Sequence, residues 1–219
     1  MKHASLCLLA FERAEYLERT LSSLVMRTHY PYELIIHNDG SQDENVRKVI
    51  DKYRQYISIS IENCGQNMGV GASMRRCADI ATGDYIFKVD ADLEFSEGWL
   101  EESVNILKNN ALVDMVGCFD YQNYTNDERF RVIKEEKDCK IVTDFVNSIY
   151  GFTRHTYENY RHLMGDDGWQ QEVTKVTGNL LAITKEDVVY NFGFGLGKSV
   201  YMNSDGTQRE KSTTTKIIC

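Results

Sequence analysis

The sequence predicts an α/β fold in which a mostly parallel, Rossmann-like central sheet is flanked by helices. Over residues 4–95, short apolar runs alternate with amphipathic helical patterns four times. The chain has 219 residues, 42% of them hydrophobic, which suits one large domain or two small ones. Because this alternation implies parallel strands, we expect the loops that follow the strands to share one edge of the sheet.

The first half of the chain supplies the clearest elements. Short apolar runs predict four buried strands, at residues 5–10, 34–36, 57–61 and 85–89. A helix with Leu17, Leu21 and Leu24 on one face follows the first strand and ends near His29, before Pro31. Two more helices are predicted, one at residues 46–53 and one that begins at residues 67–71 and carries two arginines.

The second half is less regular. It is predicted to hold a helix at residues 97–108, a strand at 113–119, a hairpin or excursion at 120–138, a strand at 176–183 and a short helix from Thr184 and Asp187 through Val189. The aromatic segment at residues 150–169 is interpreted as core, with an acceptor platform as the alternative. The glycine-rich stretch at residues 193–209 is typical of a mobile loop.

The fourth strand runs directly into two carboxylates, Asp90 and Asp92. Successive strand residues alternate faces, so both acids converge only if the backbone turns at Ala91, where the small side chain permits a turn. Two carboxylates at the carboxyl end of a strand suit a hard divalent cation that still has room for phosphate oxygens. The alternative is a solvated Asp-x-Asp in a loop.

Composition excludes several classes of protein. A net charge of -8 without a Lys/Arg stripe argues against nucleic-acid binding. The six cysteines are scattered without a Cys-x-x-Cys pair, which indicates reduced thiols in a cytoplasmic-type compartment. No apolar run reaches the roughly 18 residues of a membrane span.

Five short motifs in a fixed order carry a resemblance to a known family. They are the strand-turn-helix at residues 5–24, the turn Asn38-Asp39-Gly40-Ser41, the segment from Asn67 through Gly69 and Gly71 to Arg75, the tripeptide Gly83-Asp84-Tyr85, and Asp90-Ala91-Asp92. With these pieces the chain resembles the family 2 glycosyltransferases of GT-A fold. The resemblance covers residues 4–95 well and 176–209 loosely.

The resemblance implies an inverting, metal-dependent enzyme that moves a sugar from a nucleotide-diphosphate sugar, UDP-sugar first, to a hydroxyl of a glycan or glycoconjugate. It implies a single GT-A domain over residues 1–219, with a nucleotide-sugar half at 1–95 and a smaller mixed acceptor half at 96–219, or one domain of a longer bacterial or viral chain. A viral chain would act in the host-cell cytoplasm. The cation is Mn²⁺ or Mg²⁺, held more directly by Asp92 than by Asp90.

The residues implied in nucleotide-sugar binding cluster after the predicted strands. They are Ala10, Phe11, Glu12, Arg13, Asn38, Asp39, Asn67, Gly69, Arg75, Asp90, Ala91 and Asp92. Two of the surrounding positions depart from the family pattern. Asn38 stands where an acid that often contacts the base is usual, and Arg76 stands where an Asn commonly follows Arg75.

The family's catalytic carboxylate has no clean equivalent in this sequence. Inversion needs a general base for the acceptor hydroxyl, and a carboxylate is the usual choice. Asp205 is the first candidate because it follows the glycine-rich stretch in family order. The pair Asp166 and Asp167 is the second candidate, and Glu172 is the third.

Other functions fit the motifs less well. A phosphotransferase with an Asp-x-Asp motif would carry it in the first strand, and a dinucleotide-binding oxidoreductase would have a third glycine where Met74 stands. A nucleotidyltransferase would show a glycine-rich loop in place of residues 11–14. A non-catalytic nucleotide-sugar or carbohydrate-binding module of the same fold remains the alternative, which donor turnover would separate.

Overall fold

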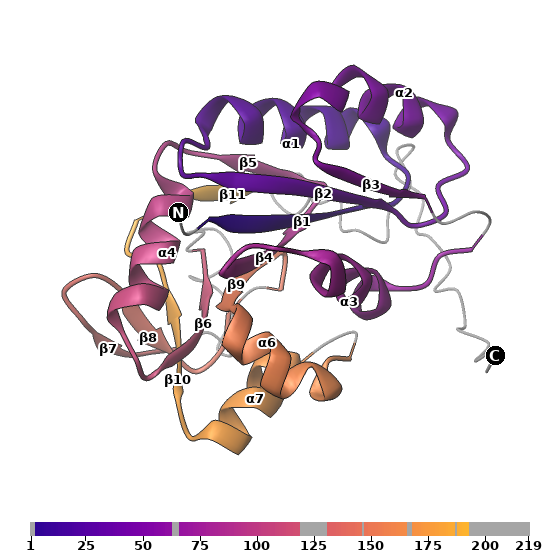
Figure 1. Ribbon diagram of the computed structural model, residues 1–219. Coiled ribbons are helices and arrows are strands. Elements are labelled where there is room, and N and C mark those ends of the chain that lie inside the picture. Colours follow the sequence, from indigo (N-terminus) through magenta and orange to yellow (C-terminus); the bar gives the residue numbers. More distant parts are fainter. Residues whose placement is uncertain are drawn as a thin grey trace.

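The computed structural model describes residues 3–62, 66–118, 131–145, 147–165, 168–186 and 188–192. A nine-stranded sheet in the order β3-β2-β1-β4-β9-β6-β10-β8-β7 forms the centre, and helices cover both of its faces (Figure 1). The predicted α/β class, with a large central sheet flanked by helices, is confirmed. In the described part of the chain no helix is both long and apolar enough to cross a membrane.

The first half of the chain builds the parallel part of the sheet. Its strands are β1 (Ala4–Ala10), β2 (Tyr32–Asn38), β3 (Ile59–Glu62) and β4 (Tyr85–Asp90), and β1 lies between β2 and β4. The connections are α1 (Ala14–Arg27), α2 (Glu44–Lys52) with the short η1 (Arg54–Tyr56), and α3 (Val70–Ile80). All four strands therefore end at the same edge.

The second half adds a mixed region, as the sequence predicts. β6 (Val113–Gly117) and β10 (Leu180–Ile183) are parallel to each other, whereas β7 (Val132–Glu135), β8 (Lys140–Val142) and β9 (Ile149–Thr153) make antiparallel pairs. A separate pair joins β5 (Leu93–Phe95) to β11 (Val189–Asn191). The helices are α4 (Trp99–Asn109), α6 (Arg154–Tyr160), η2 (Arg161–Leu163) and α7 (Trp169–Thr177).

Two predictions for the second half are wrong. The strand expected at residues 176–183 begins only at Leu180, because α7 runs through Thr177 to keep Trp169 and Val173 buried and ends at Gly178 with φ 71°. The helix expected from Thr184 through Val189 is also wrong: the described residues 184–186 are not helical, and Val189 begins strand β11, because the edge of β5 takes residues 189–191 as its antiparallel partner. Thr184 does not cap a helix, and Asp187 lies outside the described residues.

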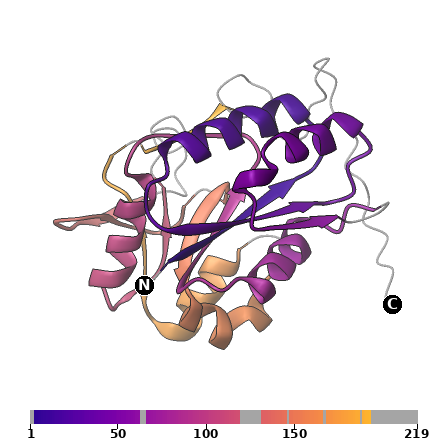
Figure 2. The ribbon, with the colours of Figure 1, turned by 45° about the horizontal axis from the view of Figure 1, so that its top comes forward.

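Helices on the two faces of the sheet bury two apolar clusters (Figure 2). On the face of α1, α2 and α4, Trp99 packs between Phe95 and Phe87, with ring centroids 4.6 and 5.8 Å away. On the face of α3, α6 and α7, Trp169 packs edge-on against Phe152 at 4.8 Å. Tyr150, Phe152, Tyr157 and Trp169 are all buried, so the aromatic segment contributes mainly to the core.

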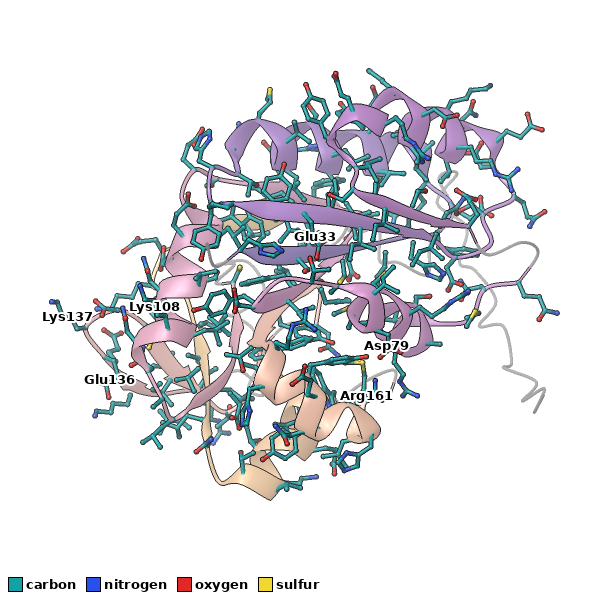
Figure 3. All side chains as sticks on the ribbon, viewed as in Figure 1. Glu33, Asp79, Lys108, Glu136, Lys137 and Arg161 are labelled. Carbon is teal, nitrogen blue, oxygen red and sulfur yellow. The ribbon has the colours of Figure 1, made fainter. Side chains whose placement is uncertain are left out.

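The helices of the second half are tied to the C-terminal end of α3, beside the edge where the parallel strands begin. Arg161 forms an ion pair with Asp79 of α3 at 2.7 Å (Figure 3). The Tyr157 hydroxyl donates to the same carboxylate at 2.9 Å. Arg154 donates to the carbonyl groups of Ala81 and Gly83. These contacts fix the mixed half of the fold against the nucleotide-sugar half that the sequence predicts.

The turn after β2 depends on a glycine. Gly40 has φ 80°, and a Cβ added there would lie 2.7 Å from the backbone carbon of Gln66. Gly98 has a similar φ of 77° but nothing within 4 Å of such a Cβ, so it is a matched control. We expect Gly98→Ala to cost about 1 kcal/mol of unfolding free energy through strain alone and Gly40→Ala about 3 kcal/mol or more, measured by urea unfolding. Equal losses would show that the close approach is relaxed at little cost.

Candidate active site

The ends of the parallel strands place most of the predicted binding residues at one edge of the sheet. Ala10 lies opposite Asn38 in the β1–β2 ladder, and Leu9 lies opposite Asp90 in the β1–β4 ladder. Glu62, at the end of β3, lies opposite Asn38. The amide of Asp39 donates to the carbonyl of Ala10 at 2.8 Å. The edge predicted from strand and helix alternation is therefore a continuous row of polar groups.

The loop after β1 is strained and braced. Glu12 and Arg13 both have positive φ angles, 55° and 59°, a region that non-glycine residues seldom adopt. The Glu12 amide donates to the Ser41 hydroxyl at 2.8 Å, and its carboxylate accepts from the amides of Gln42 and Asp43 at 2.8 and 3.2 Å. This bracing holds Arg13 with a guanidinium nitrogen 3.6 Å from a carboxylate oxygen of Asp92.

Asp39 joins the end of β2 to the start of α3. Its two carboxylate oxygens accept from the amides of Met68 and Gly69 at 2.9 and 3.1 Å, and Asn67 also accepts from the Gly69 amide at 2.8 Å. Gly69 has φ 87°, which favours glycine. Asp39, Asn67 and Gly69 therefore form one connected group, and their common role in nucleotide binding stays a prediction.

Asn38 is buried and both ends of its amide are engaged. The side-chain nitrogen donates to Glu62 at 2.9 Å, and the side-chain oxygen accepts from the Ser41 amide at 3.3 Å. In this arrangement Asn38 shapes the edge, and its contact with a base stays a prediction. Glu62, the hydrogen-bond partner of Asn38, places a carboxylate next to the position where the family usually has an acid. Glu62 is not among the residues predicted from the sequence.

The two arginines of α3 contact residues other than Asp90 and Asp92. Arg75 is exposed and donates to the carbonyl of Met164, and Arg76 donates to the sulfur of Met68 at 3.4 Å. The role of Arg75 at a diphosphate stays a prediction. Among the described residues, the cations that pair with Asp92 and Asp90 are Arg13 and Lys88, and Lys88 is not one of the site residues predicted from the sequence.

Lys88 lies inside β4 with its side chain only 3% exposed, and its ammonium group is 2.6 Å from a carboxylate oxygen of Asp90. A lysine between buried apolar strand residues is unusual, since lysine is almost never fully buried unless it is paired. The lysine within the apolar sequence Phe87-Lys88-Val89 is therefore the signal from which a role of Lys88 could have been predicted.

Burial governs the charge state of the two acids. Burial raises the pKa of the Asp92 carboxyl to about 6, and the nearby Asp90 adds to this rise, whereas Arg13 and Lys88 oppose it. Burial also raises the pKa of Asp90, against the effect of Lys88. The raised pKa values therefore come mainly from loss of water around the carboxylates, and a bound divalent cation would favour their charged forms.

The donor set fits a hard cation that takes part of its shell from a ligand. Both acids offer oxygen, the ligand atom that Mg²⁺ and Mn²⁺ prefer. Within the described ranges no group of three or more His, Cys, Asp or Glu is placed to hold a metal by itself. Phosphate oxygens or water would therefore have to complete the coordination, as the sequence analysis expects.

Asp92 should make the stability of the metal-free protein depend on pH. Its folded-state pKa of about 6 lies above the ordinary value near 3.9, so its contribution to folding is full below about pH 4 and is lost as the pH rises through 6. We expect Asp92→Asn to remove most of this loss, in urea unfolding with chelator between pH 4.5 and about 7.5. An unchanged pH profile in the variant would contradict the assigned charge state.

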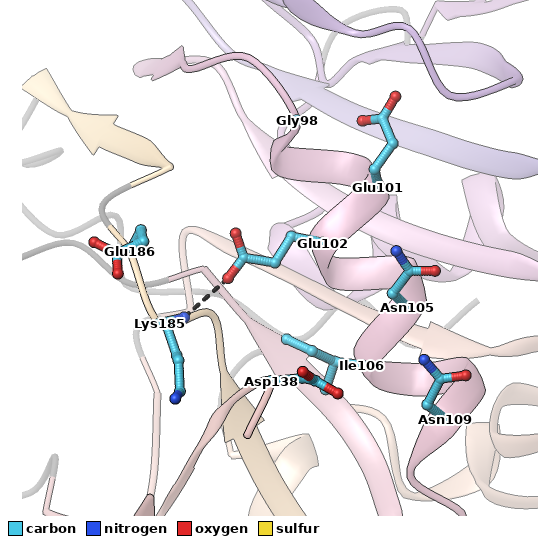
Figure 4. A pocket seen from close by; sticks show the side chains of 9 residues that line it. All are labelled: Gly98, Glu101, Glu102, Asn105, Ile106, Asn109, Asp138, Lys185 and Glu186. Carbon is cyan, nitrogen blue, oxygen red and sulfur yellow. Dashed lines mark hydrogen bonds between the residues drawn. The ribbon is translucent and has the colours of Figure 1, made fainter. Parts of the chain in front are cut away.

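A cavity of about 650 Å³ lies elsewhere, between α4 and the segment after β10 (Figure 4). The charged residues of its lining are mostly acidic, with Glu101, Glu102, Asp138 and Glu186 against one lysine, Lys185. The Lys185 amide donates to the Glu102 carboxylate at 2.9 Å. An anionic diphosphate would be repelled there, so this cavity does not compete with the strand-end site as a donor pocket.

The general-base candidates are placed unequally. Asp205, Asp166 and Asp167 lie outside the described residues. Glu172, in the first turn of α7, pairs with Lys175 at 2.6 Å and has a side chain 52% exposed. The last described residue, Phe192, donates its amide to the carbonyl of Asp92 at 3.2 Å. The chain therefore leaves the described region directly beside the carboxylate pair.

Comparison with known proteins finds relatives that are glycosyltransferases. A glucosyl-dolichyl phosphate glucuronosyltransferase of Haloferax volcanii is 30% identical over 51% of this chain and 35% of its own length. A dolichyl-phosphate beta-glucosyltransferase of Trichomonas vaginalis is 29% identical over 64% of this chain and 41% of its own. The chain thus spans less than half the length of these curated relatives.

Solved structures share the fold at low sequence identity. The crystal structure of GalNAc-T7 with UDP, GalNAc and Mn²⁺ superposes with a TM-score of 0.69 at 15% identity, over 87% of this chain and 44% of that one. S. aureus TarS 1-349 superposes with a TM-score of 0.61 at 14% identity, over 87% and 60%. These likenesses identify the fold as GT-A.

A family model extends over most of the chain. The model described as glycosyl transferase family 2 matches residues 5–186. That range contains β1, the Asn38–Ser41 turn and the Asp90-Ala91-Asp92 motif, which carried the resemblance in the sequence. The chain therefore belongs to glycosyltransferase family 2.

Proposed function

We propose that this chain is the catalytic domain of an inverting, metal-dependent glycosyltransferase. Its donor would be a nucleotide-diphosphate sugar, with a UDP-sugar as the favoured one, and its acceptor a hydroxyl group of a glycan or glycoconjugate. The observation that carries the proposal is the pair Asp90 and Asp92 at the carboxyl end of β4, beside Arg13. An Escherichia coli relative, 31% identical over 35% of this chain, is a UDP-Gal-dependent galactosyltransferase, and GalNAc-T7 was crystallised with UDP and Mn²⁺. Both findings favour UDP as the nucleotide.

Different residues at the strand ends would bind different parts of the donor. Asp39, Asn67 and Gly69 form the connected group at the end of β2 that would hold the nucleotide, with Ala10 and Phe11 beside it. Arg13 lies on the side of Asp92, where a diphosphate oxygen would gain a charged donor. Asp92, with Asp90 next to it, would hold Mn²⁺ or Mg²⁺, which supplies positive charge to the leaving diphosphate.

The acceptor proton needs a carboxylate on the other side of the sugar. Asp205 is our first candidate for the general base, because it follows the glycine-rich stretch of the sequence in family order. Asp166 and Asp167 are the alternative, because Met164 just before them is held by Arg75 of α3. Glu172 is the weakest candidate, since its carboxylate is exposed and paired with Lys175.

We propose a reducing compartment for the enzyme, supported by four buried thiols among the described residues. Cys7, Cys77, Cys118 and Cys139 are buried and unbridged, in keeping with a reducing, cytoplasmic-type compartment. The chain covers less than half the length of these curated relatives, so we make no proposal from them about the acceptor.

The proposal predicts a joint effect of nucleotide and metal on stability. UDP should raise the melting temperature of the protein far more with Mn²⁺ or Mg²⁺ than with chelator, because phosphate oxygens complete the shell of an ion held by Asp92. Thermal unfolding in the four combinations of UDP and metal tests this. Equal stabilisation by UDP in chelator would remove the metal from the proposal.

Release of UDP from UDP-sugars with an acceptor, with and without metal, tests the function itself. A chain that binds UDP-sugar but turns over none with any glycan acceptor would be the non-catalytic binding module.

A further inference from the structure

Lys88 is a charged side chain in the centre of the sheet. Its neighbours in register are Cys7 on β1 and Tyr150 on β9, and both are buried. Burial of an ammonium group is costly unless ion pairs and hydrogen bonds compensate it. A hydrophobic residue would fill the same space without that cost, so the contacts of Lys88 indicate what it does.

Those contacts join the carboxylate motif to the turn before β9. The Lys88 ammonium lies 2.6 Å from an oxygen of Asp90 and also donates to the carbonyl of Asn147. The Asp90 amide donates to the carbonyl of Ser148 at 3.0 Å, and Asn191 donates to the Ser148 hydroxyl at 2.8 Å. Asp90 is therefore fixed through both its backbone and its side chain.

Asp92 is held more loosely. Its charged partner Arg13 is 3.6 Å away, beyond ordinary hydrogen-bond distance, on a side chain that is 15% exposed and reaches in from a loop. An incoming cation can displace such a partner, whereas Lys88 is enclosed by the sheet and its repulsion would act at short range in a medium of low dielectric constant.

We propose that Lys88 is a positioning residue that keeps the Asp90 carboxylate in an ion pair and so leaves Asp92 as the direct metal ligand of the two. The inference rests on the proposed function, because it concerns the same metal. The two acids then have different roles. Asp92 coordinates the metal, whereas the ion pair of Asp90 with Lys88 stabilises the turn at Ala91 and the neighbouring Asn147–Ser148 turn.

Binding of Mn²⁺, followed by electron paramagnetic resonance of the free ion, tests this without turnover. In the absence of nucleotide we expect Lys88→Met and Lys88→Gln to bind Mn²⁺ on the order of tenfold more tightly than the wild type, because a cation is removed and Asp90 is released. Lys88→Met/Asp90→Asn should return to within about twofold of the wild type, because the released carboxylate is gone. A residue that only fills space would not alter Mn²⁺ affinity.

Unchanged or weaker Mn²⁺ affinity in both single variants would overturn the inference. If the single variants fail to fold, the double variant Lys88→Met/Asp90→Asn is used, because it removes both charges together. In the presence of UDP this double variant should still bind Mn²⁺, whereas Asp92→Asn should not. Loss of UDP-dependent Mn²⁺ binding in that double variant would equally overturn the inference. If the wild type itself binds no Mn²⁺ with UDP, the proposed function fails instead.

Discussion

Replacing Asp92 by alanine should lower the turnover number on the order of 10²-fold or more while the fold stays intact. The carboxylate is only 5% exposed and lies at the carboxyl end of β4, next to Arg13 and Asp90. Its loss would remove the proposed ligand of the cation that supplies positive charge where the diphosphate leaves. The melting temperature without metal should not fall, because burial of this charge is unfavourable in the metal-free protein.

Glu94→Ala is the matched control for this change. Glu94 is two residues further along the chain and pairs with Arg19 and Arg27, at 2.5 and 3.5 Å. Its removal should leave the turnover number within about twofold of the wild type, since partly exposed ion pairs contribute little. Near-normal turnover in Asp92→Ala, measured as UDP release at saturating Mn²⁺, would place the metal elsewhere.

Replacing Asp205, the proposed general base, by asparagine should have the second large effect. We expect Asp205→Asn to lower sugar transfer by about 10²-fold to 10⁴-fold with little change in UDP-sugar affinity, because the acid takes the acceptor proton and does not touch the nucleotide. Transfer is measured with acceptor present, and donor affinity by equilibrium titration in its absence.

Asp166→Asn and Asp167→Asn are made in parallel. If Asp205→Asn transfers normally and one of these two does not, the role passes to that residue. Loss of donor affinity together with transfer would instead mark the replaced acid as part of the donor site. Normal transfer in all three variants would refute a carboxylate base at any of them.

The first half of the fold was predictable because each element carries a local signal. Short apolar runs at 5–10 and 85–89 and a helix face of Leu17, Leu21 and Leu24 fix strand and helix without tertiary information. The strand ends then follow from topology, so the convergence of Asn38, Asp39 and Asp90 could be expected before the structure was known.

The second half depends on contacts distant in sequence. Val189 pairs as a strand only because β5 offers an edge, and Val176 stays helical because α7 must cover the sheet until Gly178. The same holds at the site. Lys88 and Glu62 owe their importance to partners that folding brings together, Asp90 from the same strand face and Asn38 from the neighbouring strand. Local propensity does not report such pairs.

Anomalous X-ray diffraction from crystals grown with UDP and Mn²⁺ would locate the metal relative to Asp92 directly. The account predicts an anomalous peak at an ordinary metal–oxygen distance, about 2.0–2.6 Å, from the Asp92 carboxylate, with phosphate oxygens completing the shell. A peak bound away from Asp92, or UDP bound at the ends of β1 and β2 with no metal at saturating Mn²⁺, would contradict it.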